Sequence, residues 1–292
     1  MLTVFTPTYN RAGLLGRLYE SLCRQTNKNF KWLVIDDGSA DNTKNIVNGW
    51  IKENQINIEY FYKNNGGMHT AHNAAYRIID TELNVCIDSD DFMPDNAVEK
   101  IIEIWDNCLE KNSVAGIIGL DADLSGNIIG TRIPENLKFG NLNDLYSRHK
   151  VTGDKKMVLR TSVVKQYPLY PEFEKERLVP LGILYLMIGK DYDFIYTNAV
   201  LCYVDYQPSG SSNTILKQYQ QSPKGFLYAR LMQIKYSQNS KDKIKPYLHL
   251  ISSSLFSKDF KWIKQNNHFL WFLFLWPAGL LLHFYIKIKN SL

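Results

Sequence analysis

The amino-acid sequence predicts an α/β fold with a mostly parallel, doubly wound sheet, followed by a helical tail. Three observations lead to this prediction. In roughly the first 110 residues, short β-branched segments alternate with segments of helical periodicity, which is typical of βαβ units. Polar loops follow the predicted strands, where such sheets bind ligands. From about residue 215 the chain becomes basic and helical, and it ends in a strongly apolar segment.

Each expected strand is a short apolar run bounded by turn residues. The first four expected strands are residues 2–6, 31–35, 57–62 and 84–87. Helical spacing of apolar residues and capping signals predict helices between them. These expected helices are residues 11–26, 43–53, 69–79 and 94–110. Further along, we expect a strand at 114–120, loops over 121–155, a loop leading into a helix at 167–188, and strands within 193–206.

The chain length and the cysteines bound the class of protein. At 292 residues the chain can hold one large α/β domain with a tail. The four cysteines, at positions 23, 86, 108 and 202, form no Cys-x-x-Cys pair, so we expect a reducing compartment. The N-terminus runs straight into a predicted strand, so we expect no secretory signal.

Charge is distributed unevenly along the chain. From residue 217 to the end there are 12 Lys and Arg against two Asp, whereas residues 1–216 hold 22 basic and 27 acidic residues. A basic tail behind an acidic front indicates a second role at an anionic surface. The tail is coupled to an apolar run rather than to base-stacking loops, so nucleic acid is not expected as a partner.

Three aspartates, Asp88, Asp90 and Asp91, directly follow the expected strand 84–87. Like charges this close repel one another, and burying them without partners is costly. A second acidic pair, Asp36 and Asp37, follows the strand 31–35, and both loops should meet at one edge of the sheet. An oxygen-rich edge of this kind suits Mn²⁺ or Mg²⁺. The alternative is a solvated turn with helix-capping aspartates.

Four segments, taken in order, resemble a known family. They are "TPTYNRAGLLGRLYESLCRQT", "WLVIDDGSADNT", "NGGMHTAHNAA" and "CIDSDDFMPD". Together they resemble the GT-A glycosyltransferases of family 2, and most closely the bacterial branch that builds capsular and other surface polysaccharides. The resemblance covers roughly residues 2–212. It implies a GT-A fold for residues 1–212, with residues 213–292 as a basic helical extension.

The resemblance implies a site for a nucleotide-diphosphate sugar, and a UDP-sugar is favoured. Pro7, Thr8 and Tyr9 match the segment that lines the nucleotide base, with Tyr9 placed to stack on it. Asp37 matches the acid that accepts a hydrogen bond from the base, and its neighbour Asp36 is expected to hold the loop.

The same resemblance assigns different roles to the three clustered acids. Asp88 and Asp90 match the DxD pair of the family. Asp90 is expected to be the principal ligand of Mn²⁺ or Mg²⁺, and Asp88 to contact the ribose, or the metal through water. Asp91 is expected to support the loop or to line the sugar pocket.

The segment "NNGGMHTAHN" departs from the family at one position. Met68 stands where the family usually has Lys, so a diphosphate contact expected there is either missing or supplied by Arg11. His69 and Asn73 remain donor-side candidates. Three residues downstream match the segment that closes over the donor diphosphate: Tyr206, Ser209 and Ser212.

Inverting sugar transfer also needs a general base to deprotonate the acceptor hydroxyl. "YPEFEKERLVPLGILYLMI" resembles the family segment that carries this acid, but Leu181 stands where a Glu is expected after Pro180. We therefore expect Glu176 to act as the base. The alternative is that Glu176 belongs to a solvated charge run.

The tail contains an apolar segment, residues 269–286, with one His, one Pro and one Gly. As a helix it would be about 27 Å long, at the short end for crossing a membrane. Pro277, three tryptophans and flanking lysines instead fit a segment in the lipid interface. We expect the cytoplasmic face of the inner membrane, with peripheral, monotopic or C-terminally anchored attachment. The alternative is a buried helix or an oligomer contact.

The sequence thus predicts an inverting, metal-dependent glycosyltransferase. It would move a sugar from a nucleotide-diphosphate donor to a lipid-linked glycan acceptor in surface polysaccharide biosynthesis. The alternative is a catalytically impaired GT-A module that binds nucleotide-sugar or a partner transferase. A receiver-like or phosphatase-like domain would leave "NGGMHTAHN" and the tail without a use.

Overall fold

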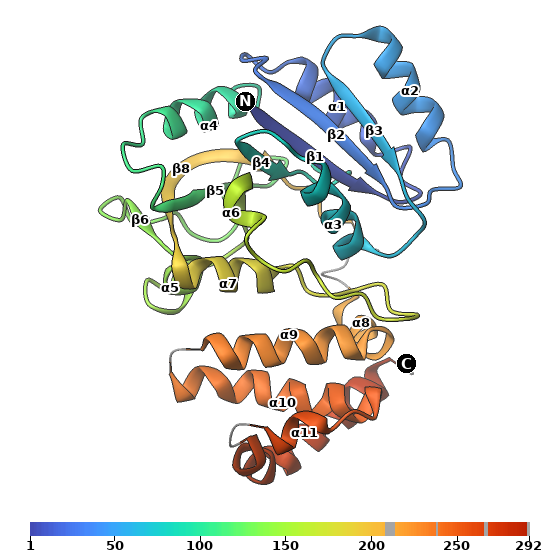
Figure 1. Cartoon of the computed structure of the whole chain (residues 1–292), viewed down its shortest axis with the longest axis vertical. Helices are drawn as coiled ribbons and strands as arrows, with labels where there is room; N and C mark the ends of the chain where they lie inside the picture. Colours follow the sequence, from blue (N-terminus) through green and yellow to red (C-terminus); the bar gives the residue numbers. More distant parts are fainter. Residues whose placement is uncertain (208–213, 238, 266–267, 291–292) are drawn as a thin grey trace. The chain divides into compact units, whose positions relative to one another are not determined.

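The computed structural model describes the chain apart from residues 208–213, 238, 266–267 and 291–292. The described residues form two compact units (Figure 1). The first unit comprises residues 1–169 and 187–207, and the second comprises residues 170–186 and the described residues after 207. The segment 170–186 therefore belongs with the C-terminal helices, although the last strand of the sheet follows it in sequence.

An eight-stranded sheet organises the first unit, in the order β3-β2-β1-β4-β7-β5-β8-β6. The strands are β1 (Leu2–Thr8), β2 (Phe30–Asp36), β3 (Ile58–Tyr62), β4 (Leu83–Cys86), β5 (Val114–Ala122), β6 (Phe139–Gly140), β7 (Lys155–Arg160) and β8 (Asp193–Tyr203). Neighbours among β1 to β4 pair in parallel, β5 pairs in parallel with β8, and β7 and β6 run antiparallel to their neighbours. The mostly parallel sheet is therefore confirmed.

Helices cover both faces of this sheet. They are α1 (Leu15–Cys23), α2 (Thr43–Glu53), α3 (Met68–Ile78), α4 (Ala97–Asp106), α5 (Leu142–Ser147) and α6 (Thr161–Val164), while α7 (Gly182–Asp191) is divided between the units. Successive side chains of a strand point to opposite faces. Val4 of β1 joins the core formed with α1, α2 and α4. Its neighbour Phe5 instead contacts His72 and Tyr76 of α3 edge to face, with ring centroids 5.0 and 5.7 Å apart.

The structure differs from the sequence prediction mainly within residues 121–165. We expected loops there up to residue 155, but β7 begins at Lys155 and lies between β4 and β5 in the sheet. The strand begins with two lysines, so its sequence lacks the continuous apolar run that predicts a buried strand. Lys155 is buried because its ammonium donates to backbone carbonyls, among them that of Thr152 at 2.8 Å. Partners contributed by the fold thus allow a charged residue at the start of a central strand.

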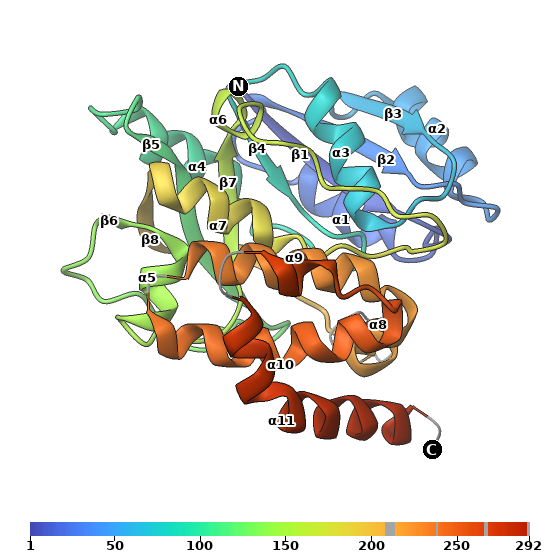
Figure 2. The same cartoon turned by 60° about the horizontal axis from the view of Figure 1, so that its bottom comes forward.

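The second unit is helical. Its helices are α8 (Ile215–Gln221), α9 (Pro223–Tyr236), α10 (Ser240–Ser257), the 3₁₀ helix η1 (Lys261–Lys264) and α11 (His268–Lys289). α10 packs against both α9 and α11 (Figure 2). Tyr247, Leu250 and Ile251 of α10 form the centre of this core, together with Ile234 and Trp262.

Candidate active site

Polar loops follow β1 and β2 at the same edge of the sheet. The Asp37 N–H donates to the Thr8 carbonyl at 2.8 Å, so the two loops leave the sheet side by side. Farther out, the Asn10 N–H donates to Ser39 Oγ at 2.8 Å. Parallel pairing of β1 with β2 and with β4 brings the carboxyl ends of all three strands to this edge.

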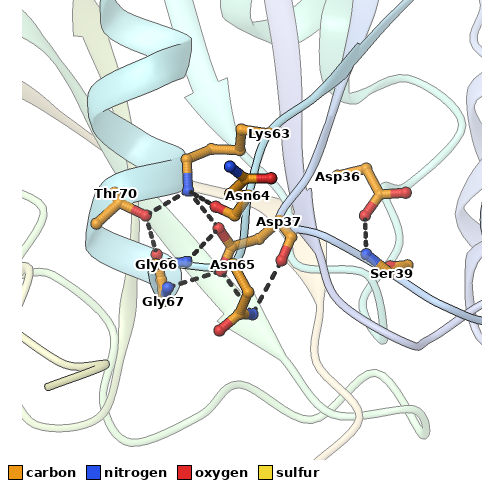
Figure 3. A network of polar contacts seen from close by, with 9 residues as sticks. All are labelled: Asp36, Asp37, Ser39, Lys63, Asn64, Asn65, Gly66, Gly67 and Thr70. Atoms are coloured by element: carbon orange, nitrogen blue, oxygen red, sulfur yellow. Dashed lines mark hydrogen bonds and ion pairs between the residues drawn. The ribbon is translucent and has the colours of Figure 1, made fainter. Parts of the chain in front are cut away.

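Asp37 is buried, and donors from the loop before α3 surround its carboxylate (Figure 3). Oδ1 accepts hydrogen bonds from Lys63 Nζ and from the Gly66 N–H, the latter at 2.9 Å. Oδ2 accepts from the Gly67 N–H at 2.7 Å and from Asn65 Nδ2 at 3.2 Å. A carboxylate offers about four lone-pair sites. The acceptor capacity of Asp37 is therefore used within the chain.

This network holds the entry to α3. Lys63 Nζ also donates to Thr70 Oγ1 at 2.7 Å, which adds the first turn of the helix to the network. Gly67, directly before the helix, has φ +94°, a conformation that favours glycine. The expected hydrogen bond from Asp37 to a nucleotide base stays a prediction. It requires replacement of one of the four donors, of which Asn65 Nδ2 is the most distant.

Asp36, the other acid of the pair, also holds loop backbone. Its Oδ1 accepts from the Ser39 N–H at 2.7 Å, as Figure 3 shows, and its Oδ2 accepts from the Tyr60 hydroxyl at 2.5 Å. Asp36 thereby links the end of β2 to β3, through Tyr60, and to the turn after β2, through Ser39.

The DxD loop after β4 meets a guanidinium from the loop after β1. Arg11 Nη1 lies 3.1 Å from Asp90 Oδ2 and donates to Ser89 Oγ at 3.2 Å. Burial raises the pKa of Asp90, Arg11 lowers it in part, and Asp88 raises it again. The structure thus brings together Arg11, Asp90 and Asp88, three residues of the predicted site.

Asp91 connects the DxD loop to the chain after β8. Its Oδ1 accepts the Asp205 N–H at 3.1 Å. Burial raises the pKa of Asp91 to about 7, the ammonium of Lys156 lowers it in part, and Asp88 raises it. Lys156 itself lies 3.7 Å from Oδ1 of the buried Asp121. Lys156 thus places a mostly buried positive charge among the acids of this edge.

Among the described residues, no group of three or more His, Cys, Asp or Glu is arranged to hold a metal ion. Mg²⁺ and Mn²⁺ sites that use one or two carboxylates and complete their shell with substrate phosphates do not need such a group. Asp90 and Asp88 fit that kind of site. Burial and their mutual repulsion disfavour the charged form of Asp90, so an added cation would be favoured there.

The other donor-side candidates differ in exposure. Pro7 and Thr8 are buried at the end of β1, and Thr8 Oγ1 has no hydrogen-bond partner in the part of the chain that the structure describes. Tyr9 is 48% exposed, so its side chain is accessible from solvent. His69 and Asn73 are both buried within α3.

The predicted base Glu176 lies in the second unit. Its Oε1 accepts the Lys224 N–H at 3.0 Å and its Oε2 accepts the Gly225 N–H at 2.8 Å, at the start of α9. A side chain at Gly225 would meet the carbonyl oxygen of Leu178 at 2.1 Å, so glycine permits this close approach. Glu176 therefore caps a helix in the structure, and its role as the base stays a prediction. At Leu181 the carbonyl accepts the Tyr170 hydroxyl at 2.9 Å.

Sequence reasoning missed three basic residues of this region, Arg17, Lys63 and Lys156. Arg17 Nη2 donates to the Asp90 carbonyl at 2.6 Å and to Asp205 Oδ2 at 2.7 Å, so it ties the DxD loop to the chain after β8. The available signal was position, because Lys63 directly follows β3 and Arg17 lies in the first turn of α1. Of the residues expected to close over the donor, Tyr206 donates its hydroxyl to Asp154 at 3.0 Å. The other two lie outside the described residues: Ser209 and Ser212.

Comparison with known proteins supplies a family. The family model described as "Glycosyl transferase family 2" matches residues 3–166, which is more than half of the chain. The glycosyltransferase GlyG of Streptococcus pneumoniae serotype 4 is 28% identical over 104 residues, or 35% of this chain and 34% of GlyG. The match thus spans about a third of the length of this relative.

Two solved structures have a similar fold. Residues 1–349 of TarS from S. aureus, in complex with UDP-GlcNAc, superpose with a TM-score of 0.62 at 17% identity, covering 87% of this chain and 72% of that one. The mannosyltransferase PcManGT from Pyrobaculum calidifontis, in complex with GDP-Man and Mn²⁺, gives a TM-score of 0.57 at 15% identity, covering 99% and 83%. At these identities the likeness concerns the fold.

The Asp37 network yields a test of stability. Asp37→Asn turns an amide NH₂ toward backbone N–H donors and removes a charge-assisted acceptor. We expect the free energy of unfolding to fall by about 2–3 kcal/mol, measured by urea denaturation. Trypsin should also cleave faster after Lys63, because the loop loses its anchor.

Asp123→Asn is the matched control. The Asp123 carboxylate also accepts several hydrogen bonds, in this case three, from the Ser125 and Asn127 N–H groups and from Asn127 Nδ2, but it lies in an exposed turn. This variant should unfold and resist trypsin like the parent. Equal losses of unfolding free energy in both variants would show that the buried network around Asp37 stabilises the fold no more than the exposed turn at Asp123.

His72 yields a test of pH dependence. Burial lowers the pKa of His72 to about 4, although Asp88 raises it in part. In the unfolded chain His72 therefore takes up a proton near pH 6.5, whereas in the folded chain it takes up that proton only near pH 4. Stability must fall as the pH drops through this window, by about 2.5 kcal/mol between pH 7 and pH 4.5.

His72→Leu should remove that share of the acid sensitivity in urea denaturation at the two pH values. The substitution also removes the contacts of His72 with Tyr76 and Cys86, at 3.3 and 3.6 Å, and this loss lowers the free energy of unfolding equally at the two pH values. His149→Leu, at a partly exposed histidine of the same unit, serves as the control. If the His72 variant keeps the slope of the parent, the buried neutral histidine is not the cause.

Proposed function

The chain belongs to glycosyl transferase family 2, and from this premise we propose that it is an inverting, metal-dependent enzyme. It moves a sugar from a nucleotide-diphosphate donor, with a UDP-sugar favoured, to a lipid-linked glycan acceptor in surface polysaccharide biosynthesis. The observation that carries the proposal is the meeting of Arg11 with the DxD loop at the carboxyl edge of the sheet, where Arg11 Nη1 and Asp90 Oδ2 are 3.1 Å apart.

The solved structures of similar fold support a nucleotide-sugar donor. TarS was solved with UDP-GlcNAc, and PcManGT with GDP-Man and Mn²⁺. In this chain, Tyr9 offers an exposed ring at the end of β1, which suits stacking on a nucleotide base. The buried hydroxyl of Thr8 is available beside it.

Asp90, with Asp88, would hold Mn²⁺ or Mg²⁺, which when bound supplies positive charge to the departing diphosphate. The guanidinium of Arg11 is suited to the same anion, because its planar set of N–H donors matches phosphate oxygens. In the structure that guanidinium pairs with Asp90, so it already lies at the proposed diphosphate site.

The proposed reaction is a displacement at the anomeric carbon. The acceptor hydroxyl oxygen forms a bond to that carbon, the bond to the diphosphate oxygen breaks, and the nucleoside diphosphate leaves with the electron pair. The hydroxyl proton passes to a general base. Glu176 remains our candidate for that base. To act, it would have to give up at least part of its hydrogen bonding to the start of α9.

A second candidate function is a catalytically impaired module that binds nucleotide-sugar or a partner transferase. Two observations favour it. Leu181 stands where the family resemblance leads us to expect an acid, and both carboxylate oxygens of Glu176 accept backbone N–H groups. Such a module would bind the donor but would not turn it over on a lipid-linked acceptor.

The proposed location is the cytoplasmic face of the inner membrane, where a lipid-linked acceptor would be available. The basic second unit and its apolar helix α11 support association with an anionic membrane surface.

The proposal predicts turnover that depends on Asp90 and on a divalent cation. Purified chain should hydrolyse or transfer from a panel of UDP-, GDP- and dTDP-sugars in the presence of Mn²⁺. Asp90→Asn or added EDTA should lower the rate at least about 100-fold, equivalent to about 2.7 kcal/mol of transition-state stabilisation. Excess Mn²⁺ should restore the EDTA-treated parent.

Asp95→Asn is the matched control, because Asp95 lies four residues after the DxD loop's Asp91 and pairs with Arg24 on the surface. It should keep the rate of the parent. Turnover indifferent to both EDTA and Asp90→Asn would refute the metal-dependent enzyme. Donor binding in calorimetry without turnover, on a verified acceptor, would favour the impaired module.

A further inference from the structure

α11 combines two properties that do not usually occur in one helix of a water-soluble domain. Among the described helices it alone is long and apolar enough to cross a membrane. Its 22 residues correspond to about 33 Å, longer than the 18-residue segment seen in the sequence. Yet α11 does not stand alone, because it is part of the helical core of the second unit.

One side of α11 packs against its neighbours along its whole length. Near its start, Trp271 stacks on Tyr247 of α10 with ring centroids 5.0 Å apart. In the middle, Gly279 lies so close to α10 that a Cβ would meet the Ile251 side chain at 2.7 Å. Near its end, Asn290 Nδ2 donates to a backbone carbonyl of α8 at 2.9 Å.

The other side of α11 is apolar and exposed. Phe274 is 88% exposed and Leu281 is 71% exposed, although soluble domains rarely leave such side chains in a continuous row. Spacings of three, four and seven residues, or their sums, place six of the exposed apolar residues on one face of the helix. We call this face the apolar stripe, and it consists of Leu270, Leu273, Phe274, Leu281, Phe284 and Ile288.

Positive charge lies at both ends of the apolar stripe. No acidic residue occurs from position 260 to the end of the chain. Exposed lysines lie before the helix and in its last turn: Lys258, Lys261, Lys264, Lys287 and Lys289. An apolar face between clusters of lysines complements an anionic lipid surface in both chemistry and charge.

We infer that α11 lies in the plane of an anionic lipid surface, with the apolar stripe inserted at the boundary between headgroups and acyl chains, and does not cross the bilayer. Crossing would carry α8 along or break its contact with Asn290. α8 has the sequence ILKQYQQ and no buried residues, so its lysine and glutamines would enter hydrocarbon without partners. This inference rests on the membrane association proposed above and adds the orientation and the contact face.

Vesicle binding by the full chain tests the contact face. The parent should co-sediment with vesicles of phosphatidylcholine and phosphatidylglycerol, and less with phosphatidylcholine alone. Phe274→Glu with Leu281→Glu should weaken binding at least about tenfold, whereas Leu109→Glu should leave it unchanged. Leu109 is the matched control because it is 99% exposed in the first unit.

A second variant does not touch the packed core. Lys287→Glu with Lys289→Glu should weaken binding to the anionic vesicles and leave binding to neutral ones unchanged, because it reverses charge at the end of the apolar stripe. Unchanged binding of both double variants would overturn the inference.

Lysine labelling separates lying from crossing. A membrane-impermeant amine reagent is added outside vesicles that carry bound protein, and the labelled lysines are read by mass spectrometry. A helix in the plane exposes both lysine clusters to the reagent, so Lys261 and Lys289 should be labelled before and after detergent alike. Protection of one cluster until detergent is added would show that α11 crosses the bilayer.

Another copy of the chain is the competing occupant of the apolar stripe. In that case sedimentation without lipid would show a dimer that the Phe274 and Leu281 variant dissociates, and the lipid inference would fail. Donor binding measured on the same variants keeps the two proposals separate. If the parent binds vesicles as expected but binds no nucleotide-sugar, the proposed function fails while the orientation of α11 stands.

Discussion

Directly after β2, the carboxylate of Asp37 is buried, and four donors from one loop form hydrogen bonds to its two oxygens. Burying an ion in this way is unfavourable unless each lone pair is matched. Here the match comes from the stretch between β3 and α3, so β2, β3 and α3 are joined through a single side chain. The glycines of that stretch expose their N–H groups to the carboxylate without side chains in the way. The remaining loops of the candidate site lie at the same edge of the sheet as this hydrogen-bonded network.

The DxD edge shows the opposite situation, because its acids exceed the cations supplied by the chain. Arg11, Arg17 and Lys156 come from a loop, a helix and a central strand, and they contact Asp90 or lie among its acidic neighbours. Even so, burial raises the pKa of both Asp90 and Asp91. An edge with excess negative charge favours a ligand that brings a cation with it, and a nucleotide-sugar bound with a divalent ion is such a ligand.

The second unit combines two kinds of contact that sequence alone describes poorly. Glu176 caps α9 through two backbone N–H groups, which gives an acid expected in catalysis a clear role in holding a helix. α11 packs one side on α10 and leaves the other side apolar and exposed. Both features couple a functional proposal to the stability of the same helical core, so a substitution at Glu176 acts on folding as well as on any proton transfer.

The sequence by itself determined the alternation of strands and helices, because periodicity reports directly which faces are buried. It also determined which loops meet at one edge, since parallel strands place their carboxyl ends together, and the family that the four segments indicate. It did not disclose β7, because the two lysines at its start are tolerated only through partners that folding brings to them: backbone carbonyls for Lys155 and the carboxylate of Asp121 for Lys156. Nor did it rank Asp37 as the holder of a loop, or Glu176 as a cap, because both roles depend on which donors lie within about 3 Å after folding. The tertiary structure likewise decided that α11 has one packed side and one free side, since a helix that is apolar all round carries no mark of which face its neighbours will cover.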